Sequence, residues 1–308
     1  MASTSGARVV RFELPTHAER VPRAASGGFA SLRRFLGSSL VGSASLVVLL
    51  LVAATAFFAD ALAPYHPLQT DYTMIGRPPS AEHLLGTDLL GRDVLSRLIY
   101  GARVTLIVAV SSVLAGDSVG FVWGLVSGYL GRRFDVISQR FLDILMAFPA
   151  LILAMLLVVS FGSGLHTVII AIAVTRVPLA TRVIRSTVLS TKEMAFVEAA
   201  RGLGASGVRL MRRHLGPQCV APLLVIASFN LGTAIFAEAA LSFLGVGVPP
   251  PTPTWGSMLG GVLAEAFRPP WWLVVFPGLA ITVTIVAANL LGDALRDFLD
   301  PRLKRQVE

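Results

Sequence analysis

Two charged side chains stand alone inside apolar stretches of the sequence. Asp117 interrupts the apolar stretch from 104 to 126, and Arg176 follows the uncharged stretch from 144 to 175. A lone charge at the centre of a membrane-spanning helix costs roughly 2.5–3.5 kcal/mol on insertion scales. We therefore expect the two residues to form a buried ion pair, or to face a water-filled path in which they contact a charged solute.

No group of side chains in the sequence forms a pattern that is typical of catalysis. The two lysines, Lys192 and Lys304, do not stand in the glycine-rich pattern of a nucleotide-binding P-loop. The zinc-protease pattern His-Glu-x-x-His is missing, and the single cysteine, Cys219, excludes a multi-cysteine metal site. We therefore expect a non-catalytic chain that itself binds no metal, ATP or other cofactor.

The composition is typical of a chain solvated by lipid. Of the 308 residues, 54% are hydrophobic and 14% are charged, whereas soluble domains carry about 25% charged residues. Long uncharged stretches alternate with short arginine-rich ones. The net charge of +8 requires no nucleic-acid partner, because the basic cytoplasmic loops of a membrane protein produce the same excess.

Six segments are long and apolar enough to cross a bilayer, which takes about 20 residues of helix. The third and fourth are separated by the breaker cluster Phe161 to Gly164. The sequence therefore predicts an all-α polytopic membrane protein, with a transmembrane domain at 36–292 between tails at 1–35 and 293–308. The expected spans lie near 37–59, 104–126, 144–160, 165–184, 219–243 and 271–292.

Basic residues predict the topology. With the N-terminus in the cytoplasm, 20 Lys and Arg residues lie in inside segments and five in outside segments, which favours both termini in the cytoplasm. The tail 1–35 is expected to be cytoplasmic and disordered. The competing interpretation is a cleavable signal peptide that ends at Ala61-Leu62-Ala63, although the apolar run before this triplet is long for one.

The longest inside loop, 188–217, predicts a helix from Ser190 to Leu203. Thr191 can cap this helix, and Gly204 stands where it ends. Apolar side chains recur at every third position and form a narrow stripe, which suits a groove in a partner protein or a surface of lipid headgroups. The stripe consists of Met194, Val197, Ala200 and Leu203.

This loop resembles a motif of a known family. Glu198-Ala199-Ala200 followed by Gly204 is similar to the E-A-A-x-x-x-G loop in permease subunits of bacterial ABC importers. Three further motifs narrow the resemblance to the C-type permease of the dipeptide, oligopeptide and nickel branch, over roughly residues 35–303. They lie between His83 and Arg103, between Glu238 and Gly256, and between Asn289 and Arg302.

The resemblance implies the type I ABC importer permease fold in a bacterial cytoplasmic membrane. It also implies a homologous permease, two cytoplasmic ATPases that bind ATP and Mg, and an extracytoplasmic substrate-binding protein. The path between the permeases would carry peptides, nickel or a similar solute. A self-contained secondary transporter or channel is the alternative, although no repeat of broken helices supports it. In the family the loop helix couples the ATPases to the path, which implies this role for Lys192, Glu193, Phe196, Val197, Glu198, Ala199, Ala200 and Gly204.

Two segments, 83–103 and 245–255, are expected on the outside. Leucines at helical spacing in the first predict an interfacial helix that braces the bundle or contacts the binding protein. Prolines stiffen the second, which is either a plain connection or a ledge on which the binding protein docks. Glu238 is expected to be a structural carboxylate rather than a substrate ligand. The residues of the ledge would be Pro249, Pro250, Pro253 and Trp255.

The loop departs from the family pattern near its end. The family's His-Ile-Leu-Pro is replaced by His214-Leu215-Gly216-Pro217. Because glycine leaves the backbone free to adopt many conformations, we expect Gly216 to loosen the entry to the fifth span.

Overall fold

The computed structural model of the chain describes residues 39–299. The predicted tail 1–35 lies outside the described residues, and so does residue 300 onward of the predicted tail 293–308.

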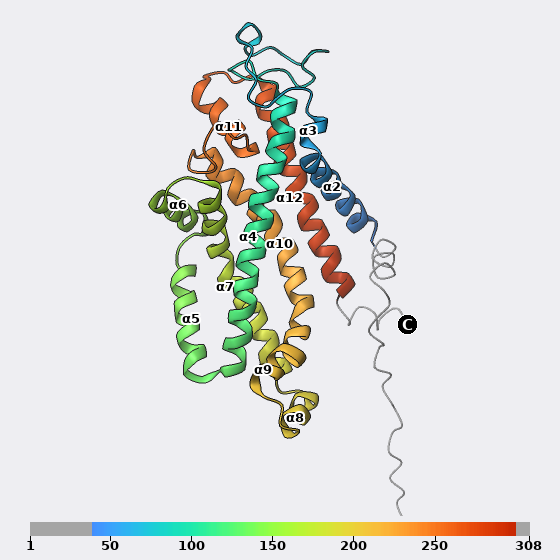
Figure 1. The fold of residues 1–308 in the computed structure, drawn as a ribbon, viewed down its shortest axis with the longest axis vertical. Helices are drawn as coiled ribbons and strands as arrows, with labels where there is room; N and C mark the ends of the chain where they lie inside the picture. Colours follow the sequence, from blue (N-terminus) through green and yellow to red (C-terminus); the bar gives the residue numbers. More distant parts are fainter. Residues whose placement is uncertain (1–38, 300–308) are drawn as a thin grey trace, which may run out of the picture.

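The described residues form an elongated bundle of helices (Figure 1). Residues 63–93, here called the cap, lie at one end of the bundle beside α11, and α8 lies at the opposite end. The α-helices are α2 (Leu40–Phe57), α3 (Ala59–Leu62), α4 (Val94–Leu130), α5 (Arg132–Met146), α6 (Ala150–Phe161), α7 (Leu165–Thr191), α8 (Ala195–Gly202), α9 (Gly207–Leu210), α10 (Gly216–Phe243), α11 (Trp255–Glu265) and α12 (Trp271–Leu299). A 3₁₀ turn, η1 (Tyr72–Met74), and a π-helical turn, η2 (Met211–Leu215), complete them.

Five helical segments of the described chain are long and apolar enough to cross a membrane: α2, α4, α7, the stretch Gly207–Phe243 and α12. The sixth candidate is α5 together with α6, which are bent by 86°. The predicted third span near 144–160 is therefore not one straight helix. Pro149 disfavours helical backbone at Phe148 and supplies no N–H to a continuing helix, so the chain bends there.

The end of the bundle that carries the cap also differs from the sequence-based expectation. α4 begins at Val94, about ten residues before the predicted second span, and continues without a break to Leu130. The interfacial helix predicted within 83–103 does not form over 83–92, where Gly86 and Gly91 have φ values of +78° and +73° that interrupt a helix. α11 is a helix that the sequence pattern does not predict.

α4 and α7 pack closely along a column of glycines. A β-carbon on Gly124 would lie 2.5 Å from the carbonyl oxygen of Thr181, and one on Gly120 would lie 2.5 Å from the β-carbon of Ala180. Because atoms do not approach so closely, only glycine permits this separation of the two helices. Small residues at every fourth position commonly let membrane helices approach in this way. The column consists of Gly116, Gly120, Gly124 and Gly128.

The largest buried apolar cluster joins α4, α6, α7 and α10. Val108, Ile172 and Ile235, from three of these helices, are fully buried in it. Side chains on the periphery of the bundle, such as Leu50 and Leu51 of α2, are more than half exposed. Such exposure suits a surface solvated by lipid tails, which are as apolar as these side chains.

We predict that Gly124→Ala lowers the free energy of unfolding by about 1–3 kcal/mol, because the added methyl group forces α4 away from α7. The matched control is Gly278→Ala in α12, where a β-carbon meets no atom within 4 Å and alanine favours the helix by about 1 kcal/mol. Denaturant unfolding of both variants in detergent measures the difference. Equal stability of the two variants would contradict the close packing.

Candidate functional site

The segment with the family-like loop motif lies at the α8 end of the bundle (Figure 1). α7 runs unbroken to Thr191, and α8 begins at Ala195 after a turn at residues 192–194. The predicted helix start at Ser190 is therefore corrected. Thr191 does not cap α8, because its side chain is buried in the last turn of α7 together with Val188.

The turn before α8 is held to the end of α4. The Nζ of Lys192 donates a hydrogen bond to the carbonyl oxygen of Gly128 at 3.2 Å. Gly128 lies in the last turn of α4, where carbonyl oxygens lack partners within the helix and a positive charge is favourable. This contact ties the start of α8 to α4.

α8 ends where the motif glycine was expected to end it. The amide of Gly204 donates to the carbonyl oxygen of Arg201 at 2.9 Å, and the amide of Ala205 donates to that of Ala200 at 3.1 Å. Together with the φ of +80° at Gly204, these bonds form a Schellman motif, for which glycine is the usual residue.

Only part of the predicted apolar stripe faces outward. Val197 is fully buried against residues of α7, α9 and η2, including Leu210 and Leu215. The stripe therefore does not form one exposed surface, because one side of a short helix must pack on its own chain. Leu203 is 89% exposed. The other exposed residues of the segment are Glu193, Met194, Ala195, Phe196, Glu198, Ala199, Arg201, Gly202 and Gly204.

Two ion pairs join α5 to α7 near the same end. Arg185 binds both carboxylate oxygens of Asp135, each at 2.5 Å, and the hydroxyl of Ser127 in α4 donates to this carboxylate at 2.6 Å. Arg182 pairs with Asp143 at 2.5 Å. From the sequence, these arginines could be assigned only to the basic residues expected on the cytoplasmic side. Their partners Asp135 and Asp143 could not be identified, because the sequence does not show that α5 lies beside α7.

α10 begins directly after the π-helical turn η2. The amide of Gly216 donates to the carbonyl oxygen of Met211, five residues earlier, and a β-carbon on Gly216 would lie 3.0 Å from that oxygen. The departure from the family pattern thus coincides with a change of helical winding. Such π turns often occur at functional sites.

Asp117 and Arg176 lie on adjacent helices but do not form the predicted ion pair. The Oδ1 of Asp117 accepts a hydrogen bond from Nδ2 of Asn230 in α10 at 2.8 Å. Within the described chain, the buried Oδ2 of Asp117 and the buried Nε of Arg176 have no hydrogen-bond partner. Arg176 is nevertheless close, because its β-carbon would touch a β-carbon placed on Gly116. The sequence singled out both charges but could not show that Asn230 would lie beside Asp117.

We predict that Asn230→Leu lowers the free energy of unfolding by about 1–3 kcal/mol, because it leaves the Asp117 carboxylate without its partner. The same change in an Asp117→Leu background should cost less, since no buried acceptor remains. A double-mutant cycle by unfolding in detergent measures the coupling. Additive losses in the double variant would rule out the interaction.

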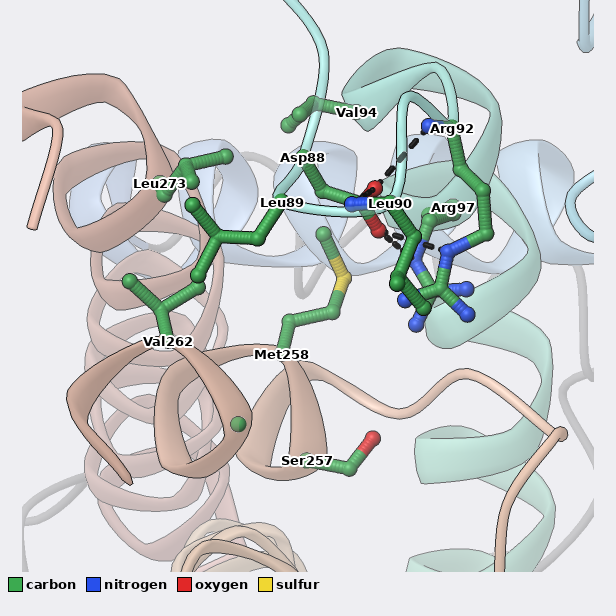
Figure 2. A pocket seen from close by; sticks show the side chains of 11 residues that line it. Asp88, Leu89, Leu90, Arg92, Val94, Arg97, Ser257, Met258, Val262 and Leu273 are labelled. Atoms are coloured by element: carbon green, nitrogen blue, oxygen red, sulfur yellow. Dashed lines mark hydrogen bonds and ion pairs between the residues drawn. The ribbon is translucent and has the colours of Figure 1, made fainter. Parts of the chain in front are cut away.

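The cap is built around the carboxylate of Asp88 (Figure 2). Its Oδ1 accepts from the backbone amides of Leu90 and Arg92 at 2.8 and 2.9 Å, and its Oδ2 pairs with Nε of Arg92 at 2.7 Å and of Arg97 at 3.5 Å. Asp88 and Arg92, four residues apart, thus interact in a loop rather than in a helix. Beside them lies a pocket of about 60 Å³ that reaches Ser257 and Met258 of α11.

The other polar residues of the cap fix it to the helices. Asp93 caps α4, because its Oδ2 accepts from the amide and hydroxyl of Ser96, each at 2.7 Å, while its Oδ1 lies 2.9 Å from Nδ1 of the buried His83. The indole of Trp272 donates to the carbonyl oxygen of Thr87 at 3.3 Å. This motif between His83 and Asp93 therefore braces the bundle, as the structural interpretation of 83–103 expected, although without a helix.

The predicted docking ledge is only partly accessible. Pro249 and Pro250 are exposed, but Pro253 and Trp255 are buried. The indole nitrogen of Trp255 donates to the carbonyl oxygen of Leu98 at 2.9 Å, because α11 folds back onto the start of α4. The buried tryptophan holds the ledge in place and does not offer a surface.

Glu238 is fully buried between α4 and α10. Its two carboxylate oxygens accept from the hydroxyls of Thr105 and Ser242, each at 2.8 Å. A buried carboxylate is tolerated only when it is hydrogen-bonded in this way. The geometry matches the structural role predicted for Glu238.

A surface ion pair closes the end of α2. Arg103 donates from Nε to the carbonyl oxygen of Ala56 at 2.9 Å and pairs with Asp60 at 2.9 Å, which also accepts from the hydroxyl of Tyr100 at 2.7 Å. The bonds from Arg103 and Tyr100 hold the pKa of the Asp60 carboxyl below its ordinary value. The ion pair therefore stabilises the fold above about pH 4, where the Asp60 carboxyl is ionised.

Because the folded-state pKa of Asp60 is the lower one, its stabilisation should be lost as the pH falls below about 4 through that pKa. We predict that Asp60→Asn weakens the fold at pH 7 and reduces the acid dependence of its stability. Melting temperatures between pH 3 and pH 7 test this. Glu82→Gln, which removes an exposed carboxylate of the cap, is the control. An unchanged acid dependence in Asp60→Asn would argue against the pair.

The chain is similar to known transport proteins in sequence and in fold. Residues 120–305 match the family described as binding-protein-dependent transport system inner membrane component. A putative peptide transport system permease protein of Brucella abortus is 42% identical over 261 residues, which cover 85% of this chain and 88% of the relative. The glutathione transport system permease protein GsiD of Pectobacterium atrosepticum is 41% identical over 273 residues, or 88% of this chain and 90% of the relative.

A third relative and a solved structure extend the comparison. The di/tripeptide transport system permease protein DppC of Pseudomonas aeruginosa is 43% identical over 265 residues, covering 84% of this chain and 87% of the relative. An inward-facing structure of the MetNI methionine ABC transporter superposes with a TM-score of 0.55 at 19% identity, over 70% of this chain and 97% of that chain. The superposition on the MetNI structure shows a common fold.

Proposed function

Because this chain belongs to the family of binding-protein-dependent transport system inner membrane components, we propose that it lines an import path for peptides and that α8 couples this path to ATPases. The chain is a permease subunit of an ABC importer and a multi-pass protein of the cytoplasmic membrane. A substrate-binding protein and an ATPase are its partners. The full assembly we propose has a second, homologous permease and two ATPases.

Peptides are the proposed solute class. The names of three relatives above 40% identity refer to peptides, glutathione or di/tripeptides. We propose that this chain contributes to a path for short peptides and leaves ATP hydrolysis, with its Mg, to the partner subunits.

α8 is the proposed contact with the ATPase. Phe196 on its exposed side and Leu203 directly after its last residue form an apolar pair suited to a groove in another protein. Four arginines in and just after α8 (Arg201, Arg209, Arg212 and Arg213) are exposed, which favours placing this end in the cytoplasm. The cap then faces the extracytoplasmic side.

The bonds around α8 supply the proposed mechanical link. A push on α8 reaches α7 through a turn of three residues, and α4 through the bond between Lys192 and Gly128. The pairs between Asp135 and Arg185 and between Asp143 and Arg182 bring α5 along. Since the glycine column holds α4 against α7, closure of the ATPases would displace these helices together and reshape the path between the permeases.

We predict that Leu203→Asp reduces association of the ATPase at least about tenfold and lowers uptake in parallel, because a carboxylate must be desolvated in an apolar groove. Leu84→Asp is the matched control: Leu84 is 62% exposed in the cap, at the other end of the bundle. Co-purification and peptide uptake by the reconstituted complex measure both effects. Unchanged ATPase association in Leu203→Asp would refute the role of α8.

A further inference from the structure

We propose that the pocket between the cap and α11 is a binding site for a single carboxylate group. Its polar wall is formed by Arg92 and Arg97, whose guanidinium groups lie side by side (Figure 2). Only the placement of this pocket on the extracytoplasmic side rests on the proposed function. The residues and contacts of the site stand by themselves.

The pocket carries one uncompensated positive charge. Arg92 and Arg97 share Asp88 as their acidic partner, and Asp88 is the acidic residue among those that line the pocket. The side chains of Arg97 and Asp88 are only 8% and 11% exposed. Because a buried charge without a partner is costly, a monoanion bound here would complete the charge balance.

Asp88 carries one negative charge and can balance only one of the two arginines. It already accepts two backbone amides and the Nε of Arg92, and the Nε of Arg97 lies at 3.5 Å. The bond to Asp88 orients the Arg92 guanidinium through its Nε, and Arg97 is held by its Nε contact with Asp88 and its Nη1 bond to Pro67. A fixed plane with its remaining N–H groups directed outward is the arrangement that arginine uses to bind carboxylates.

The outer donors of the two arginines are available. The Nη1 of Arg97 donates to the carbonyl oxygen of Pro67 at 3.3 Å. Within residues 39–299, the two Nη atoms of Arg92 and the Nη2 atom of Arg97 donate no hydrogen bond. At least three nitrogens from two side chains can therefore meet an incoming anion.

The shape and remaining lining of the pocket favour a carboxylate on a short aliphatic stem. Its volume of about 60 Å³ exceeds the roughly 10–15 Å³ that a single water needs on the same measure, so a small polar group such as a carboxylate can enter. Opposite the arginines lie apolar side chains, which suit a methylene stem but not a hydrated dianion such as phosphate. They are Leu89, Val94, Met258, Val262 and Leu273.

Two sources can supply this carboxylate on the extracytoplasmic side. One is an acidic side chain on the docked substrate-binding protein, and the other is a free carboxylate, such as that of the solute. Both present the same group to the arginines, and sodium acetate serves as the probe for the site itself.

The first experiment measures the melting temperature of the purified importer complex in sodium acetate, sodium chloride of equal ionic strength, and the neutral isostere acetamide. A site that binds acetate raises the melting temperature in acetate alone. Arg92→Gln should abolish this increment, or weaken apparent acetate affinity at least about tenfold. Arg92→Lys, which retains the charge and can still reach Asp88, should restore the stability of the cap but not the full acetate increment.

The matched control is Arg77→Gln, which removes an exposed arginine of the same cap outside the pocket. It should keep the acetate increment of the unmodified complex. A purely structural role of Arg92 would shift the melting temperature equally in all three solutions. That result, or an unmodified complex with no acetate-specific increment, would overturn the proposal.

The second experiment identifies the source by measuring docking of the substrate-loaded binding protein to the complex in nanodiscs. If the carboxylate comes from the binding protein, Arg92→Gln weakens docking at least about tenfold, Arg77→Gln changes it less than threefold, and acetate competes with docking. If it is free in solution, docking is unchanged while the acetate increment is lost. The acetate readout does not depend on α8, so a failure of ATPase coupling leaves it intact and is recognised separately.

Discussion

The close approach of α4 and α7 is the constraint on which the other contacts depend. Glycines at four successive turns of α4 leave no room for a β-carbon, so the two backbones meet directly. This contact brings Lys192 within reach of the end of α4 and sets Arg185 opposite Asp135. A larger residue in the column would separate the helices and disturb the bond from Lys192 to Gly128 that ties the start of α8 to α4.

Much of the fold could be predicted from hydrophobicity, because lipid demands long apolar helices whatever their neighbours are. The bend at Pro149 was missed although the proline is visible, since the apolar run continues across it. The glycine column was also visible, as small residues at every fourth position in 116–128. What the sequence could not show is which helix would lie against that column.

The candidate site was predicted in composition but not in orientation. Periodicity placed Val197 and Leu203 on one stripe, yet Val197 packs inside its own chain and Leu203 points outward, because short helices have an inner side that only the tertiary fold defines. Trp255 is buried for the same reason. Asp117 was singled out as a charge within an apolar stretch, but its partner Asn230 lies 113 positions away in the chain, and spacing along the sequence carries no information about such a contact.

We propose that α8, α7 and α4 move as one body when the ATPases close. Distances between spin labels at Leu203, which caps the end of α8, and Leu130 of α4, both exposed, test this most directly in a Cys219→Ser complex. Addition of ATP and Mg should leave this distance unchanged while the distance from Leu203 to a label on the second permease shortens. A change between Leu203 and Leu130 as large as that between the permeases would contradict the account.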